Sequence, residues 1–236
     1  MECKGAERMS INPNMAEVAS LLGETSRATM LASLMDGRYH TASELAYMAN
    51  IKPQTASFHL AKLVEGNLLI VEKQGRHRYF QLANEDIAQF LETFLAISPP
   101  PEIRSLKQSS QMKLLQEART CYDHLAGKLG VHLTESMVDS GYLQKEQNEY
   151  VVTSEGVAFF TQFGLDLKNL KRKRRSFCHA CLDWSERRHH LAGALGHGLL
   201  IHFLELEWIT RVPTIRAIKV TEKGRKGFKQ VFHIDV

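Results

Sequence analysis

The stretch from Thr41 to Leu82, TASELAYMANIKPQTASFHLAKLVEGNLLIVEKQGRHRYFQL, decides the fold of this chain. Thr41 and Glu44 have the spacing of a capping box, which predicts that a short helix begins there. After a tight turn, Pro53 stands at the favoured first position of a second helix that runs to about Glu65. Apolar residues on both sides of a Gly-Arg-His tip then predict a β-hairpin. The stretch therefore predicts a helix-turn-helix followed by a wing.

The second helix has one apolar and one polar face. Apolar residues three and four positions apart predict the buried face; they are Ala56, Leu60, Leu63 and Val64. The polar face and the hairpin tip carry side chains that can bond to base edges and phosphates. The candidate DNA-binding residues are Gln54, Thr55, Ser57, His59, Lys62, Arg76, His77 and Arg78. We expect Phe58 to be tucked beneath the wing, with a contact to a thymine methyl as the alternative.

Three motifs in this order resemble the ArsR-type winged-helix repressors. Leu22–Arg27 (LGETSR) resembles their LG(D/E)PTR opening, with a threonine in place of the proline. Ser57–Leu63 (SFHLAKL) resembles the end of their recognition helix, and Gly75–Tyr79 (GRHRY) resembles their wing. The resemblance covers residues 15–97. It implies a homodimeric repressor of transcription that binds double-stranded operator DNA.

Length and composition limit the number of domains, the cellular location and the state of the cysteines that we expect. A chain of 236 residues is long for one winged helix, so two domains are expected. No apolar run approaches the roughly 20 residues that span a bilayer, and the N-terminus lacks a secretory core. We therefore expect a cytoplasmic protein with no membrane partner. Its four cysteines are then expected to be free thiols, metal ligands or redox groups rather than structural disulfides.

The whole chain has a net charge of +4, but the predicted DNA face has only a small local excess of positive charge. Residues 41–82 hold five lysines and arginines against three glutamates. This modest excess suits a sequence-selective repressor better than a protein that coats nucleic acid by bulk charge. The basic run at 168–175 is interpreted as a solvated linker, with a phosphate contact as the alternative.

A strongly amphipathic helix follows the wing and is predicted to begin at the cap Asn84. Its apolar face is wider than one small domain can cover, so a second copy of the chain is expected to cover it. The candidate dimer residues are Ile87, Phe90, Leu91 and Phe94. The run Ser98–Pro101 (SPPP) ends this helix. It divides the chain into a winged-helix domain at 1–98 and a second domain at 102–236.

The second domain repeats itself. HLAGKLG at 124–130 recurs 66 residues later as HLAGALG at 190–196. Cys-Tyr-Asp at 121–123 recurs 60 residues later as Cys-Leu-Asp at 181–183, so the second copy has six extra residues between these motifs. Two winged-helix-like repeats, at about 112–167 and 176–236, predict a pseudo-symmetric pair that can enclose a ligand. The expected fold class is mostly α (α+β), a winged helix-turn-helix followed by this duplicated domain.

Two kinds of effector fit the second domain. The repeats are rich in large apolar and aromatic residues, which favours an organic, aromatic small-molecule effector. Its candidate residues lie at the recurring motif and are Asp123, His124, Trp184, Arg187 and His190. The alternative is a soft divalent metal or a thiol-redox switch at the CxxC of Cys178 and Cys181. Its candidate residues are Cys121, Cys178, Cys181 and His179; plain packing is the third interpretation.

The known metal sites of the resembled family do not carry over to this chain. Their Cys-containing ELCVGDL corresponds to Glu44–Asn50 (ELAYMAN), which has no thiol. A second family variant has cysteines on the recognition helix, where this chain has Ser57 and Ala61. Any metal is therefore expected in the second domain, and no cofactor is otherwise expected. Arginines near the CxxC, among them Arg174 and Arg175, are expected to lower a thiol pKa there.

Catalytic motifs do not assemble in this sequence. It contains no phosphate-binding loop, nucleophile elbow or HExxH motif. We therefore expect that the protein is not an enzyme, and keep an enzyme that modifies a small molecule as a remote alternative. The best overall interpretation is a transcriptional repressor released from its operator by a small molecule.

Overall fold

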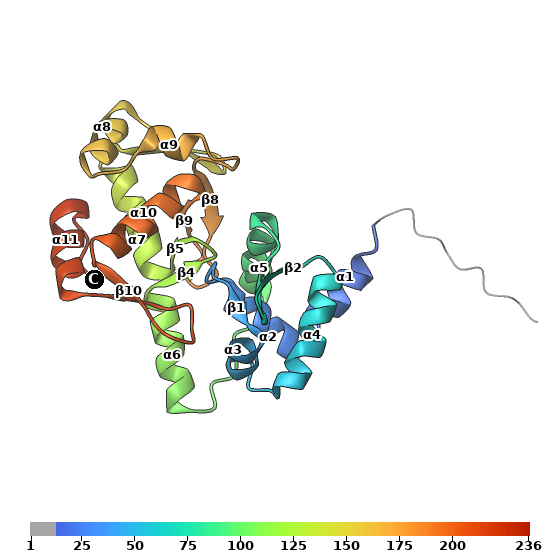
Figure 1. The fold of residues 1–236 in the computed structure, drawn as a ribbon. Coiled ribbons are helices and arrows are strands. Elements are labelled where there is room, and N and C mark those ends of the chain that lie inside the picture. The colour runs from blue at the N-terminus through green and yellow to red at the C-terminus, as the bar shows by residue number, and fades with distance from the viewer. Residues whose placement is uncertain (1–12) are drawn as a thin grey trace, which may run out of the picture.

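The computed structural model describes residues 13–236, and its first half is a winged helix-turn-helix, as predicted (Figure 1). The elements are α1 (Met15–Leu22), α2 (Thr25–Leu34), β1 (His40–Thr41), α3 (Ala42–Met48), α4 (Pro53–Glu65), β2 (Leu69–Gln74), β3 (His77–Leu82) and α5 (Glu85–Ile97). Strand β3 lies between β1 and β2 in an antiparallel sheet. The helix-turn-helix is α3 and α4, and the wing is the β2–β3 hairpin.

Local signals place these elements. The Thr41 hydroxyl accepts the Glu44 N–H at 3.3 Å, and the Glu44 carboxylate accepts the Thr41 N–H at 2.7 Å, which confirms the capping box. Pro53 is the first residue of α4. Leu60 and Leu63 of α4 are fully buried in the winged-helix core, at the predicted helical spacing.

The second half begins with α6 (Leu106–Glu117) and contains two copies of one unit. The first copy consists of β4 (Arg119–Cys121), β5 (His124–Ala126), α7 (Gly127–Asp139), β6 (Leu143–Glu146), β7 (Glu149–Val152) and α8 (Ser154–Gln162). After α9 (Leu167–Lys171), the second copy consists of β8 (His179–Leu182), β9 (His189–Ala192), α10 (Gly193–Glu205), β10 (Ile209–Arg211), β11 (Ile218–Val220) and α11 (Glu222–Phe232). No helix within residues 13–236 is both long and apolar enough to cross a membrane.

In each copy, the wing-like hairpin pairs with the backbone of the other copy. In the sheet β6-β7-β8-β9, the wing-like hairpin of the first copy pairs with the second copy, and the Tyr150 N–H donates to the Cys178 carbonyl at 3.5 Å. At the equivalent position of the other hairpin, the Ile218 N–H donates to the Ala118 carbonyl at 2.9 Å. One apolar core spans both copies and includes Phe160 and Phe228. Because the edges and the core are shared, neither copy is complete by itself.

The two halves of the chain also share a core. Cys121 and Cys181 pack in the same apolar cluster as the winged-helix leucines. The Tyr122 N–H, at the tip of the β4–β5 hairpin, donates to the Met35 carbonyl at 2.6 Å. Gly37 has φ +69°, and a Cβ there would collide with the Tyr122 carbonyl oxygen. The loop before the helix-turn-helix is thus held against the C-terminal domain.

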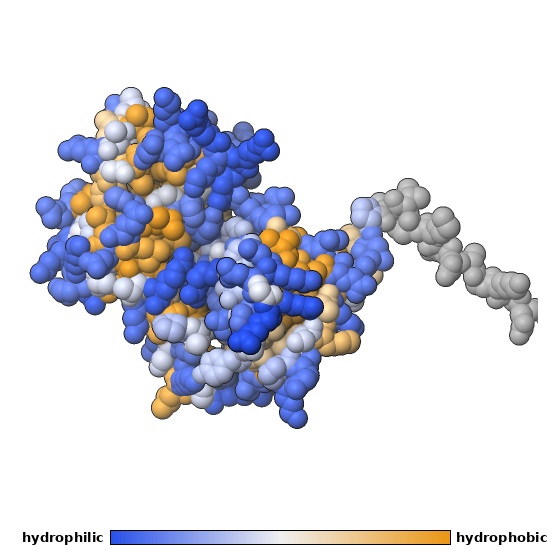
Figure 2. Space-filling view, in the orientation of Figure 1, coloured by the Kyte–Doolittle hydropathy of each residue, from blue (hydrophilic) through white to orange (hydrophobic). Residues whose placement is uncertain are grey.

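Helix α5 lies between the N-terminal helices and the C-terminal domain (Figure 1). The predicted dimer face is divided, because Leu91 is buried in the chain's own core and Ile87 is half-buried. Phe90 and Phe94 are 44% and 42% exposed and stack on each other with ring centroids 6.1 Å apart. Leu91 is therefore corrected from a dimer residue to a core residue. Figure 2 shows apolar surface over the region where α5 and β2 lie in Figure 1.

Candidate nucleic-acid interface and buried thiol–imidazole cluster

The solvent face of α4 carries most of the predicted DNA-binding side chains. Gln54, Thr55, Ser57 and Lys62 are exposed, with the Ser57 hydroxyl donating to the Pro53 carbonyl at 3.0 Å. The exposed wing tip adds three basic or imidazole side chains, Arg76, His77 and Arg78. This surface, which we call the α4–wing face, presents hydrogen-bonding groups of the kinds that contact bases and phosphates.

His59 does not belong to the α4–wing face. Its side chain is 12% exposed, and its Nδ1 lies 3.4 Å from Arg27 Nη1 and 3.6 Å from Glu24 Oε2. It therefore joins α4 to the start of α2. Phe58 is also corrected, since it is 58% exposed instead of tucked beneath the wing. The Lys62 Nζ lies 4.6 Å from the centroid of its ring.

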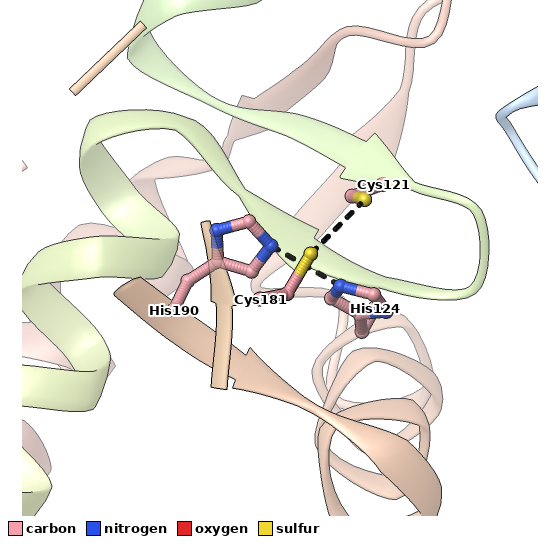
Figure 3. Close-up of side chains that lie close together, drawn as sticks. All are labelled: Cys121, His124, Cys181 and His190. Carbon is pink, nitrogen blue, oxygen red and sulfur yellow. Dashed lines mark hydrogen bonds between the residues drawn. The ribbon is translucent and has the colours of Figure 1, made fainter. Parts of the chain in front are cut away.

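A second constellation lies at the pseudo-two-fold axis of the C-terminal domain. The β4–β5 hairpin pairs Cys121 with His124, and the β8–β9 hairpin pairs Cys181 with His190. All four side chains are buried, and they point toward one another (Figure 3). The two Sγ atoms are 3.9 Å apart, and the two Nε2 atoms are 3.1 Å apart. We call these four residues the Cys₂His₂ cluster.

The recurring HLAGxLG motif builds this cluster. Its first residue is the cluster histidine, and its last is a glycine of the helix that follows. A Cβ added at Gly196 would lie 3.2 Å from the Cβ of His124, and one at Gly130 would lie 3.7 Å from the Cβ of His190. The same added atoms would lie 2.5 Å from the Leu125 carbonyl oxygen at Gly130 and 2.6 Å from the Leu191 carbonyl oxygen at Gly196. Only glycine therefore lets each helix pack this closely on the strand that carries the cluster histidine.

A carboxylate stands behind each cluster histidine. Asp123 Oδ1 lies 3.5 Å from His124 Nδ1, and Asp183 Oδ2 lies 3.3 Å from His190 Nδ1, the latter without the alignment of a hydrogen bond. Burial would raise the pKa of each carboxyl, but the facing imidazole and a nearby arginine hold the pKa well below its ordinary value. Both carboxylates are therefore charged at neutral pH.

Each of these carboxylates is joined by an arginine to α5. Arg175 pairs with Asp123 on one side and with Glu85, at 2.6 Å, on the other. Arg119 Nη2 lies 2.9 Å from Asp183 Oδ1 and 3.1 Å from Glu92 Oε1. We call these two series the Asp–Arg–Glu chains. Glu85 and Glu92 are seven residues apart, so they lie on one face of the helix.

The CxxC of the sequence does not converge on one site. Cys178 lies in the core shared by the two repeats, where burial raises its pKa to about 12, so the expected lowering by arginines is wrong. Residues three apart in an extended chain point to opposite faces, which separates Cys178 from Cys181. His179 also lies outside the Cys₂His₂ cluster, with its ring centroid 6.4 Å from that of His124. The hydrogen bond to Cys181, and burial, raise the pKa of Cys121 well above its ordinary value.

Comparison with known proteins decides the family. A family model described as a helix-turn-helix domain matches residues 22–72. The HTH-type transcriptional regulator YdfF of Bacillus subtilis (strain 168) is 52% identical over 226 residues, which cover 96% of this chain and 100% of that protein. The chain belongs to the HTH-type transcriptional regulators. The prediction of a winged helix-turn-helix regulator of transcription is confirmed.

Two solved structures also resemble the regulator over well under half of its length. The homodimeric winged helix-turn-helix domain of Mb0332 from Mycobacterium bovis, a possible ArsR-family regulator, is 23% identical with a TM-score of 0.33. That match covers 38% of the regulator and 89% of the other chain. The cadmium sensor CMTR of Mycobacterium tuberculosis is 22% identical with a TM-score of 0.33, covering 39% of the regulator and 94% of that chain.

The remaining predicted effector residues of the regulator line a separate cleft of about 710 Å³. Trp184 and Arg187 face the C-terminal end of α5, the proline segment 98–101 and α6 there. Arg187 donates to the Ala96 carbonyl at the end of α5. The buried Nε1 of Trp184 has no hydrogen-bond partner among residues 13–236. The five predicted residues thus divide between this cleft and the surroundings of the Cys₂His₂ cluster.

Proposed function

We propose that this regulator is a homodimeric repressor that leaves its operator when an effector binds the C-terminal domain. The observation that carries the proposal is the exposed α4–wing face. Gln54 has the side-chain type that reads adenine through two hydrogen bonds, and Lys62 and the wing arginines suit phosphates or groove edges. A recognition helix with a wing is a known way to fill a major groove and contact its flank.

The exposed phenylalanines of α5 support the dimer. Phe90 and Phe94 form an apolar surface with Ile97, which is also exposed. The opposite side of α5 is bonded to the C-terminal domain through Glu85 and Glu92. A rearrangement there would therefore move the helix that sets the spacing of the two DNA-binding heads. Half-sites are about 34–36 Å apart, so a small rotation takes one head out of its groove.

The first prediction tests the α4–wing face. The double replacement Gln54→Ala with Lys62→Ala is expected to abolish specific operator binding while leaving the fold intact, because both side chains are exposed on α4. Each good base contact contributes about 1–3 kcal/mol of discrimination. The measurement is a gel shift at fixed salt with operator and scrambled DNA, beside a thermal melt of each variant.

The chain offers a matched control on α11. Lys226→Ala with Gln230→Ala removes the same two residue types from exposed positions of a C-terminal helix. Operator affinity of this control is expected to equal that of the wild type. If the Gln54 and Lys62 variant also kept its operator affinity, these two residues would not be part of the DNA interface.

An organic effector in the cleft remains the second candidate. Trp184 lines the cleft, and its buried Nε1 has no hydrogen-bond partner among residues 13–236, which an acceptor on a ligand would supply. An aromatic acid at about 100 times its Kd is expected to stabilise the folded state by about 2.7 kcal/mol. The measurement is a thermal-shift screen repeated with Trp184→Phe, which keeps an aromatic ring but loses the donor. A ligand whose shift is the same in both proteins would contradict binding at this cleft.

A further inference from the structure

We propose that Cys121, His124, Cys181 and His190 bind one soft divalent metal ion, such as zinc or cadmium, and that this ion is the effector. Each repeat supplies one thiolate and one imidazole, so the ion lies at the axis between them. The effect on DNA rests on the proposed function, whereas the site itself does not.

The geometry of the cluster fits a four-coordinate ion. Bonds of about 2.3 Å to sulfur and about 2.0 Å to nitrogen in a tetrahedron place the two sulfurs about 3.8 Å apart and the two nitrogens about 3.3 Å apart. The corresponding distances here are 3.9 Å and 3.1 Å. All four ligand atoms lie within 4.8 Å of one another. The sulfur pair and the nitrogen pair therefore already have tetrahedral spacing. A sulfur and a nitrogen in such a site are about 3.5 Å apart, so the ion would draw the most distant ligand atoms together by up to about 1.3 Å.

The chemistry of the four groups favours soft metals. Thiolate and imidazole ligands bind zinc and related ions, while harder ions prefer oxygen. On binding, each thiol loses its proton to solvent and each histidine coordinates through an unprotonated Nε2. At least two protons therefore leave for each ion bound, and a third leaves where a hydrogen joins the two Nε2 atoms beforehand. Four protein ligands leave no open position, which is typical of structural or regulatory metals and not of catalytic ones.

The surroundings of the histidines support the same conclusion. Metal-bound histidines usually donate their other ring N–H to a carboxylate, which fixes the tautomer and the orientation of the ring. Asp123 and Asp183 stand in that position behind His124 and His190. Without an ion, the Nε2 pair at 3.1 Å shares at most one hydrogen. The ion would replace this single contact with bonds to both rings.

The two Asp–Arg–Glu chains give the ion a route to the DNA-binding domain. One runs from His124 through Asp123 and Arg175 to Glu85, and the other from His190 through Asp183 and Arg119 to Glu92. Both end on α5. Coordination fixes both imidazoles, so it sets the positions of both carboxylates and of the arginines that bind α5. Metal binding is therefore expected to weaken operator binding by about 5- to 150-fold, the usual range of allosteric coupling.

The experiment is a cobalt titration of the full chain under reducing, metal-free conditions. Cobalt is the probe because tetrahedral thiolate sites give it intense visible bands and charge-transfer absorption. We expect one ion per chain, at least two protons released for each ion, and displacement of cobalt by zinc and cadmium. Gel shifts with and without zinc follow the operator in the same samples.

The third buried thiol provides a matched control. All variants carry Cys3→Ser, since Cys3 lies outside the described residues. Cys178→Ser is expected to keep the cobalt spectrum and the stoichiometry, whereas Cys121→Ser with Cys181→Ser is expected to lose both. A spectrum that depends on Cys178, or no tetrahedral spectrum in the wild type, would overturn the site. If a reversible Cys121–Cys181 disulfide alone controlled operator binding, the metal site would be rejected in favour of a thiol switch.

A second variant tests the route to α5. Glu85→Gln is expected to keep the cobalt spectrum but to reduce the effect of zinc on operator affinity, because Arg175 then loses a charged partner. An unchanged zinc effect in this variant would overturn the Arg175 route. If the wild type binds cobalt as expected but binds no DNA specifically, the proposed function is overturned and the metal site stands. If the wild type binds an operator specifically but binds no metal, the metal site is overturned and the proposed function stands.

Discussion

Replacement of Arg119 by alanine is expected to lower the free energy of unfolding by about 3–5 kcal/mol. Its side chain is fully buried between the carboxylates of Glu92 and Asp183, which are buried as well. Burial favours the neutral form of Glu92, but Arg216 and Arg119 keep its pKa below the ordinary value. Removal of Arg119 leaves Asp183 without its arginine and Glu92 with Arg216 alone.

The measurement for Arg119→Ala is urea denaturation at one fixed chain concentration, since the stability of the proposed dimer would depend on concentration. Arg104→Ala is the matched control, because Arg104 also pairs with a glutamate, Glu102, but its side chain is 80% exposed. Exposed pairs contribute about 0–1 kcal/mol, so this control is expected to unfold almost as the wild type does. If both variants lost the same free energy of unfolding, the buried ion pairs of Arg119 would contribute no more than the exposed pair of Arg104.

Phe90→Glu is expected to give a monomer that no longer binds its operator specifically. A carboxylate in the middle of the exposed α5 surface opposes its burial against a second copy. A single head meets only one half-site, so affinity should fall toward the non-specific level, about 10³-fold or more weaker. Sedimentation velocity reports the oligomeric state, and a gel shift on the same sample reports DNA binding.

Val157→Glu on α8 is the matched control for this substitution. Val157 is 42% exposed, close to the 44% of Phe90, but it lies on the first C-terminal repeat. It is expected to change neither the oligomeric state nor the operator affinity. An intact dimer in the Phe90→Glu protein would show that the α5 surface is not the dimer contact.

The sequence by itself determined the winged helix-turn-helix. Its signals act within a few residues: the capping box of Thr41 and Glu44, the proline that begins α4, and the helical spacing of Leu60 and Leu63. The internal repeat was equally visible, because each copy keeps the glycine of HLAGxLG that its close packing requires. Such local requirements leave a pattern that can be read before any tertiary contact is known.

Only the tertiary structure decided which side chains meet. The CxxC indicated that Cys178 and Cys181 act together, but an extended strand turns them to opposite faces and pairs Cys181 with Cys121, 60 residues away. His59 and Leu91 likewise face inward because other elements of the fold cover them. Sequence spacing fixes the direction of a side chain only relative to its own helix or strand. Which side chain it contacts depends on how the two repeats and α5 pack, and no local sequence pattern contains that information.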